Sequence, residues 1–136
     1  MSHQFPPSEA TSNDPLARMR VYQLARLLAE ESWGDAEALA GNSVTQKLSG
    51  QLYAAVGSIA ANLGEGYSRS SGRDRARIFE YALGSARESM SWYRSAEPIL
   101  GSSIIRARLD KLEEIRRMLL AIIPRERGRL IRPRHP

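Results

Sequence analysis

Apolar residues recur every three or four positions along four long segments of the chain, the spacing that places them on one face of an α-helix. The helices predicted from this pattern cover about residues 15–33, 43–65, 72–96 and 102–124. No segment shows the sustained alternation of apolar and polar residues that predicts a β-strand. Because the connections are mostly short, the pattern favours an all-α fold, an antiparallel up-down four-helix bundle.

Capping residues and helix breakers mark the expected ends of these helices. Side chains that accept hydrogen bonds from free backbone amides predict the starts, and glycine or proline predicts the stops. The predicted starts are Asp14 followed by Pro15, the capping box from Ser43 to Gln46, Ser71, and Ser102 or Ser103. The predicted stops are Gly34, Gly66, Pro98 with Gly101, and Pro124. A short helical turn is expected over residues 35–39.

The two ends of the chain differ in composition from its middle. Residues 1–14 are rich in serine, proline and asparagine and predict a disordered N-terminal arm. Residues 125–136 hold five arginines against one glutamate, a net +4 of the chain's +5, and predict a flexible basic tail. The predicted four-helix bundle therefore covers residues 15–124.

Composition excludes several kinds of chemistry. Cysteine is absent from the 136 residues, which excludes disulfides and cysteine nucleophiles and is typical of a reducing compartment. The two histidines, His3 and His135, lie in the expected disordered ends, where neither is held beside a fixed partner. No apolar run is long enough to span a membrane, and the first residues lack the pattern of a secretory signal. We predict a cytoplasmic protein that is not an enzyme and holds no cofactor.

A set of polar residues lies beside the apolar row of the second helix and on the third helix. The set is Ser58, Asn62, Glu65, Arg69, Ser85 and Glu88. Polar groups close to a core are costly unless they are hydrogen-bonded, so we expect a structural polar network in which Arg69 pairs with Glu65 or Glu88. A metal site formed by the two glutamates is the weaker alternative, because the Glu-x-x-His element common in bundle di-metal sites does not occur.

Arginines form two groups that are candidates for contacts with nucleic acid. They are Arg69, Arg73, Arg75 and Arg77 around the second connection, and Arg125, Arg127, Arg129, Arg132 and Arg134 in the tail. We expect the groups at opposite ends of the bundle, binding the phosphates of RNA or DNA without sequence preference. No stacking platform of aromatic and basic residues is predicted. The alternative is a solvated charged loop with a tail that only aids solubility.

The polar residues also carry a family resemblance. Two motifs carry it: Ser-Ile-x-x-Asn-Leu-x-Glu-Gly-x-x-Arg over residues 58–69, and Ala-x-Gly-Ser-x-x-Glu over residues 82–88. Together they resemble the motifs of a family of four-helix-bundle proteins. These proteins were first noticed as reading frames within intervening sequences of bacterial 23S rRNA genes. The resemblance covers about residues 16–123. Gly64 stands where these proteins usually carry alanine, and the basic tail is not part of the pattern.

The resemblance implies a bundle that associates into a ring, commonly a homopentamer. A related branch, the accessory proteins of diversity-generating retroelements, forms basic pentameric barrels that bind nucleic acid and a partner reverse transcriptase. We therefore expect a non-enzymatic homo-oligomer that acts as a nucleic-acid-binding accessory factor. The alternative is a scaffold for another protein, with no nucleic-acid contact. In that case the small residues of the second helix, together with Trp92 and Tyr93, could form a protomer interface. Burial of the two aromatic residues within one protomer is equally consistent with the sequence.

Overall fold

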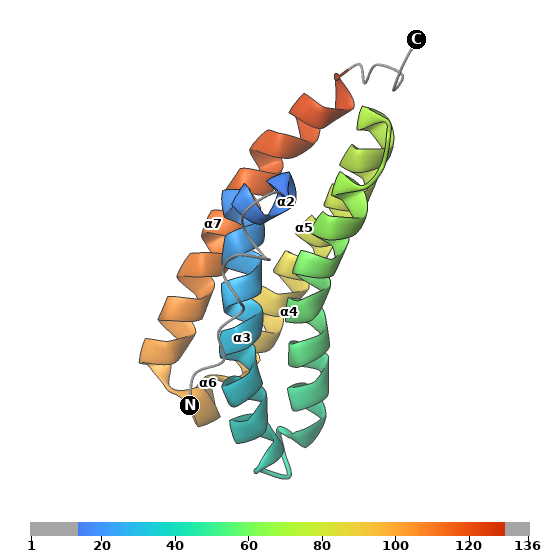
Figure 1. Ribbon diagram of the computed structural model, residues 1–136. Helices are drawn as coiled ribbons and strands as arrows, with labels where there is room; N and C mark the ends of the chain where they lie inside the picture. Colours follow the sequence, from blue (N-terminus) through green and yellow to red (C-terminus); the bar gives the residue numbers. More distant parts are fainter. Residues whose placement is uncertain (1–13, 130–136) are drawn as a thin grey trace.

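The computed structural model describes residues 14–129, which form six helices and no strand. The helices are α2 (Pro15–Arg18), α3 (Arg20–Ala40), α4 (Gln46–Tyr67), α5 (Gly72–Ser95), α6 (Glu97–Leu100) and α7 (Ser102–Arg127). The four long ones, α3, α4, α5 and α7, lie side by side, and α2 and α6 are single turns at their ends (Figure 1). Two predicted segments lie outside the described residues: the N-terminal arm apart from Asp14, and residues 130–136 of the basic tail. No helix in the described part is both long and apolar enough to cross a membrane.

Contacts between the long helices give their relative directions. Arg20, at the start of α3, pairs with Glu114 of α7. Glu31, eleven residues farther along α3, pairs with Lys111, which comes earlier in α7. These two helices therefore run in opposite directions. Only residues 68–71 join α4 to α5. The first residue of α5, Gly72, lies against Glu126 in the last turn of α7. The α4–α5 connection and the end of α7 therefore lie at the same end of the molecule (Figure 1).

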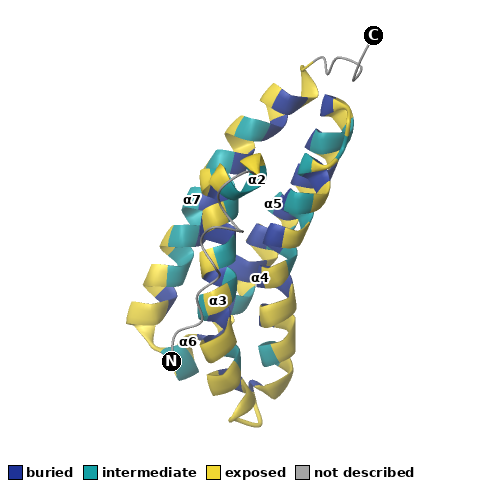
Figure 2. Ribbon diagram, viewed as in Figure 1, coloured by how far each residue is buried: buried dark blue, intermediate teal, exposed yellow. Residues whose placement is uncertain are grey.

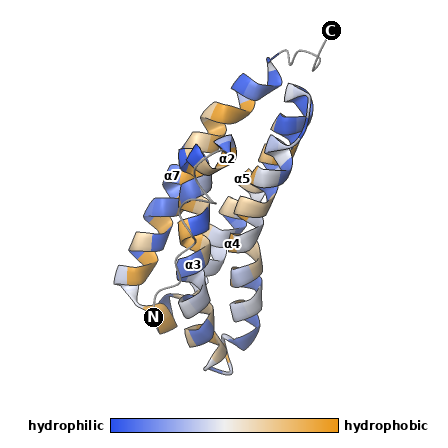
Figure 3. Cartoon of the chain, in the orientation of Figure 1, coloured by the Kyte–Doolittle hydropathy of each residue, from blue (hydrophilic) through white to orange (hydrophobic). Residues whose placement is uncertain are grey.

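The core forms where the apolar stripes of the long helices meet, and Figures 2 and 3 show the buried and apolar residues facing inward. Its largest fully buried side chains include Tyr93, Phe79 and Leu28. Burying one large apolar side chain contributes about 1.5–3 kcal/mol to the free energy of folding, so burial of this core is the main favourable term. Two positions differ from the stripes that helical spacing predicts. Leu27 of α3, predicted to face the core, is exposed, and Ile123 of α7 is buried where Ile122 was expected.

The first helical segment differs from its prediction at both ends. Asp14 does cap it, accepting a hydrogen bond from the amide of Leu16, but extended backbone at Met19 separates α2 from α3. The expected stop at Gly34 is wrong, because α3 continues to Ala40. Glycine costs about 1 kcal/mol in a helix, and burial of Leu39 beyond it offsets that cost.

Two other predicted ends are also wrong, and packing explains both. Gly66 lies inside α4 and is buried. A Cβ at this position would come within 2.7 Å of the Phe79 ring, so the absence of a side chain allows α4 to lie close to α5. The role of Gly66 is close packing against α5 rather than helix termination. Pro124 lies inside α7, which runs on to Arg127, and the Pro124 carbonyl still accepts a hydrogen bond from Gly128. Ile123 and the buried Glu126 anchor this last stretch.

The predicted caps have mixed outcomes. Ser71 caps α5 by accepting a hydrogen bond from the amide of Asp74, as predicted. The capping box from Ser43 to Gln46 is wrong, since Asn42 accepts from the amide of Val44 instead and α4 starts without a side-chain cap. The helix α7 begins after Gly101, whose φ of 87° favours glycine, and not after a capping serine.

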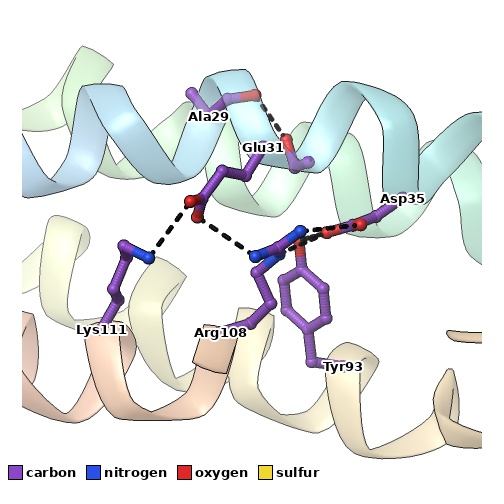
Figure 4. A network of polar contacts seen from close by, with 7 residues as sticks. Ala29, Glu31, Asp35, Tyr93, Arg108 and Lys111 are labelled. Carbon is purple, nitrogen blue, oxygen red and sulfur yellow. Dashed lines mark hydrogen bonds and ion pairs between the residues drawn. The ribbon is translucent and has the colours of Figure 1, made fainter. Parts of the chain in front are cut away.

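A largely buried charge cluster ties α3, α5 and α7 together (Figure 4). The Asp35 carboxylate accepts hydrogen bonds from the Tyr93 hydroxyl at 2.6 Å and from Arg108 Nε and Nη2 at 2.7 and 3.2 Å. Glu31 then lies 3.5 Å from Arg108 and 3.1 Å from Lys111. Two carboxylates therefore face two cations, which offsets the cost of removing them from water.

Burial first, and then the hydrogen bond to Asp35, raise the pKa of the Tyr93 hydroxyl, so this group stays protonated. The hydrogen bond to Asp35 likewise raises the pKa of Arg108. Sequence reasoning missed the cluster, because Asp35 is 58 residues from Tyr93 and 73 from Arg108 and no motif links them.

The first prediction concerns this cluster. Replacing Arg108 by methionine leaves the Asp35 carboxylate buried without its cation, and we expect a loss of about 3 kcal/mol in the free energy of unfolding. Arg106→Met is the matched control, because Arg106 is exposed on the same helix; its change should stay within about 0.5 kcal/mol. Urea denaturation measures both. Equal losses in the two variants would contradict a stabilising role for the pair.

The second prediction concerns the contact at Gly72. A Cβ at this position would lie 2.1 Å from the carbonyl oxygen of Glu126, so Gly72→Ala must push α5 and α7 apart and lower stability. Gly84→Ala, on the same helix with open space around it, should instead stabilise by up to about 1 kcal/mol through helix propensity. Thermal unfolding of both variants distinguishes them. A Gly72→Ala protein as stable as the parent would show that the close contact is not required.

Candidate functional site

Both described groups of arginines lie at one end of the molecule, where α4 ends, α5 begins and α7 ends. We call this set the basic end; it comprises Arg69, Arg73, Arg75, Arg77, Arg125, Arg127 and Arg129. The expectation that the groups lie at opposite ends is wrong, because two successive long helices return the chain to the end it left (Figure 1). Arg132 and Arg134 lie outside the described residues.

Close backbone packing holds the two parts of the basic end together. Gly72 allows the first turn of α5 to lie against the carbonyl oxygens of Glu126 and Arg129. The start of a helix carries a partial positive charge and the end a partial negative charge, so this contact is electrostatically favourable. Arg75 Nη1 adds a contact of 3.8 Å with the Glu126 carboxylate, which also pairs with Arg129 at 3.0 Å.

Some arginines of the basic end are used to build it. The Arg75 side chain is only 18% exposed, donates from Nε to the carbonyl oxygen of Arg69 at 2.9 Å, and lies 4.8 Å from the centroid of the Tyr67 ring. Arg69 pairs with Glu65 one turn earlier on α4. These contacts order the α4–α5 connection, so we assign Arg75 a positioning role.

Other arginines of the basic end remain open to solvent. Arg73 and Arg125 are exposed and form no ion pair or hydrogen bond with another described residue. Arg127 pairs with Glu80 and Arg77 with Asp74, and all four of these side chains are about half exposed. Four carboxylates (Glu65, Asp74, Glu80 and Glu126) thus face seven arginines, which leaves a net charge of +3 among them.

A shallow depression lies between the start of α5 and the end of α7. It measures ≈ 570 Å³ and is lined by Ser71, Arg73, Asp74, Arg77, Glu80 and Arg127. Hydrogen bonds to Tyr81 and then to Asp74 raise the pKa of Arg77. Guanidinium groups bind phosphate through paired hydrogen bonds, and exposed ion pairs contribute little to stability, so Arg77 and Arg127 can exchange their carboxylates for a phosphate at small cost.

The predicted polar network is only partly assembled. Ser58 and Ser85 lie 2.7 Å apart between their hydroxyl oxygens, and Asn62 Nδ2 donates to the Ser58 hydroxyl at 3.0 Å. Glu65 pairs with Arg69 at the surface rather than near the core. Glu88 is exposed and forms no ion pair or hydrogen bond with a described residue, so its place in the network was wrong. No group of three or more potential metal ligands occurs within residues 14–129.

Two tyrosines of this surface were missed by sequence reasoning, which predicted no pairing of aromatic and basic residues. The Arg77 guanidinium lies 5.8 Å from the Tyr81 ring centroid, and Tyr67 lies under Arg75. Since Arg77 and Tyr81 are four residues apart on one helix, their spacing was the available signal.

Comparisons with known proteins agree with the fold. Residues 17–121 match the family described as 23S rRNA-intervening sequence protein. A crystal structure of a protein of unknown function from the S23 ribosomal protein family of Bacteroides thetaiotaomicron is similar, with 22% identity and a TM-score of 0.69. The alignment covers 76% of this chain and 97% of that one. No curated protein sequence matches the chain. Because the family match spans most of its length, the chain belongs to the 23S rRNA-intervening sequence protein family.

Proposed function

We propose that this protein is a non-enzymatic, homo-oligomeric accessory factor that binds nucleic acid through phosphate contacts at the basic end. The observation that carries this proposal is that arginines distant in sequence, Arg73 and Arg77 of α5 and Arg127 of α7, line one depression. A single surface with a net charge of +3 attracts a polyanion more effectively than two separated groups of the same total charge. The matched family's description names no catalytic activity.

The charge arrangement supports contact with phosphates rather than with base edges. Arg73 and Arg125 have no carboxylate partner among the described residues, and a phosphate contact with either releases counterions without breaking an ion pair. The described part of the surface offers arginines mainly, which bind the repeating phosphate without reading sequence. Binding should therefore be similar for unrelated sequences and should weaken as salt is added.

Assembly would multiply these contacts. The proposed form is an antiparallel up-down four-helix bundle that associates into a homopentameric ring, as the resemblance implies. The outer face of α4 supports close association, because Gly50, Ala54, Gly57 and Ala61 are exposed and the two glycines have open space around them. Repeated copies of one basic end act together, so that individually weak phosphate contacts become collectively strong. A reverse transcriptase as partner stays a prediction of the resemblance.

The third prediction tests the assembly. Light scattering at micromolar concentration should report about five times the chain mass of 15.2 kDa. Replacing Gly57 by a bulky residue such as leucine should shift the mass downward without unfolding the protein, because Gly57 is exposed and a Cβ there has open space around it within the protomer. A monodisperse monomer at every concentration tested would contradict the proposed ring.

The fourth prediction tests binding. Neutralising Arg73 and Arg125 to glutamine should weaken the affinity for RNA and for DNA equally across unrelated sequences. Each lost phosphate contact should reduce the slope of log affinity against log salt by about 0.7–0.9. Fluorescence anisotropy with two unrelated oligonucleotides, titrated at several salt concentrations, measures both effects.

The matched control neutralises two exposed arginines far from the basic end, Arg94 at the last turn of α5 and Arg106 near the start of α7. Both double variants lose the same total charge. If the basic end is the binding surface, only the variant with Arg73 and Arg125 replaced should lose affinity. If both variants lose affinity equally, binding follows net charge rather than the basic end. If the parent protein binds no oligonucleotide at low salt, the proposal fails and the scaffold alternative replaces it.

A further inference from the structure

An exposed tyrosine contacts one of the arginines that line the depression. Tyr81 is 53% exposed although tyrosine rings are usually half-buried or more, and it lies one helical turn after Arg77 on α5. Arg77 lines the depression and also donates from Nη1 to the Tyr81 hydroxyl oxygen at 3.2 Å. The guanidinium lies over the ring, 5.8 Å from its centroid. One arginine therefore connects a cationic depression to an accessible aromatic ring.

The depression also contains acceptors that a phosphate backbone alone does not use. The carboxylates of Asp74 and Glu80 line it together with three arginines. A carboxylate repels phosphate but accepts hydrogen bonds from sugar hydroxyls and from base amino groups. In a duplex the base edges are paired and two rows of phosphates run side by side, whereas an unpaired nucleotide exposes its base and its donors. The mixture of charges therefore suits an unpaired nucleotide better than a duplex.

Resting on the proposed function, we infer that the basic end binds single-stranded nucleic acid, with a phosphate held by Arg73, Arg77 and Arg127 and an adjacent unpaired base stacked on Tyr81. Base stacking on an aromatic ring beside a cationic groove is how many proteins hold single strands, and it tolerates any base. One turn of α-helix separates Arg77 from Tyr81 by about 6 Å along its axis. The two side chains are therefore close enough for one strand to contact both.

The test compares the binding of a fluorescent single strand with that of its duplex with the complementary strand, by anisotropy at one salt concentration. The parent protein should bind the single strand more tightly. Tyr81→Ala should reduce that affinity about tenfold and leave duplex affinity nearly unchanged. Tyr81→Phe keeps the ring, loses only the hydroxyl bonded to Arg77, and should bind like the parent.

Tyr53→Ala is the matched control, because Tyr53 is 42% exposed on α4 and contacts the Trp33 ring rather than an arginine. It should leave single-strand affinity unchanged in protein whose mass by light scattering equals that of the parent. Thermal unfolding confirms that each variant is folded, which is expected for side chains so exposed. A loss with Tyr81→Phe equal to that with Tyr81→Ala would indicate a hydrogen-bonding role and overturn the stacking inference.

The outcomes separate this inference from the proposed function. If the parent binds duplex as tightly as single strand, or if Tyr81→Ala behaves like Tyr53→Ala, the single-strand inference fails while phosphate binding by the basic end stands. If Arg73 and Arg125 substitutions weaken binding and Tyr81→Ala selectively weakens single-strand binding, both are supported. If neither oligonucleotide binds the parent, both fail.

Discussion

The contact between the first turn of α5 and the last turn of α7 is the constraint on which the basic end depends. Gly72 has no side chain, so the amide end of one helix reaches the carbonyl oxygens at the end of the other. Opposite partial charges meet there, and the buried Glu126 adds ion pairs to Arg75 and Arg129. Without this approach, Arg73 and Arg77 of α5 would not line the same depression as Arg127 of α7.

The two ends of the molecule use charge in different ways. Away from the basic end, Asp35, Arg108 and Tyr93 satisfy one another inside the protein, where an unpaired charge would be costly. At the basic end, Asp74 and Glu80 pair with arginines in solvent, and the arginines outnumber the carboxylates. Buried pairs fix how the helices pack, whereas exposed pairs exchange readily with a ligand. The exposed arginines that line the depression are why we place the proposed site at the basic end.

Membership of the 23S rRNA-intervening sequence protein family accounts for the helical fold and leaves the activity to be argued from the surface. The similar structure shares the fold at 22% identity and is itself described as a protein of unknown function. Nucleic-acid binding is therefore proposed from the positions of arginines, carboxylates and Tyr81 in this chain. A surface of this kind predicts a ligand with a repeating negative charge and accessible bases.

The sequence by itself determined the helices, because helical periodicity is local and each apolar stripe is visible within its own segment. Local capping at Asp14 and Ser71 was equally readable, since the partner amides lie two and three residues away. Helix ends were not, because Gly34, Gly66 and Pro124 are tolerated only through contacts with other helices, and propensity is a weaker force than packing. The sequence also showed that the arginines form two groups, but not where the groups lie relative to each other. Only the tertiary structure decided that the two groups meet, that Glu88 stands apart, and that Asp35 finds Arg108, because each depends on which residues distant in the chain become neighbours.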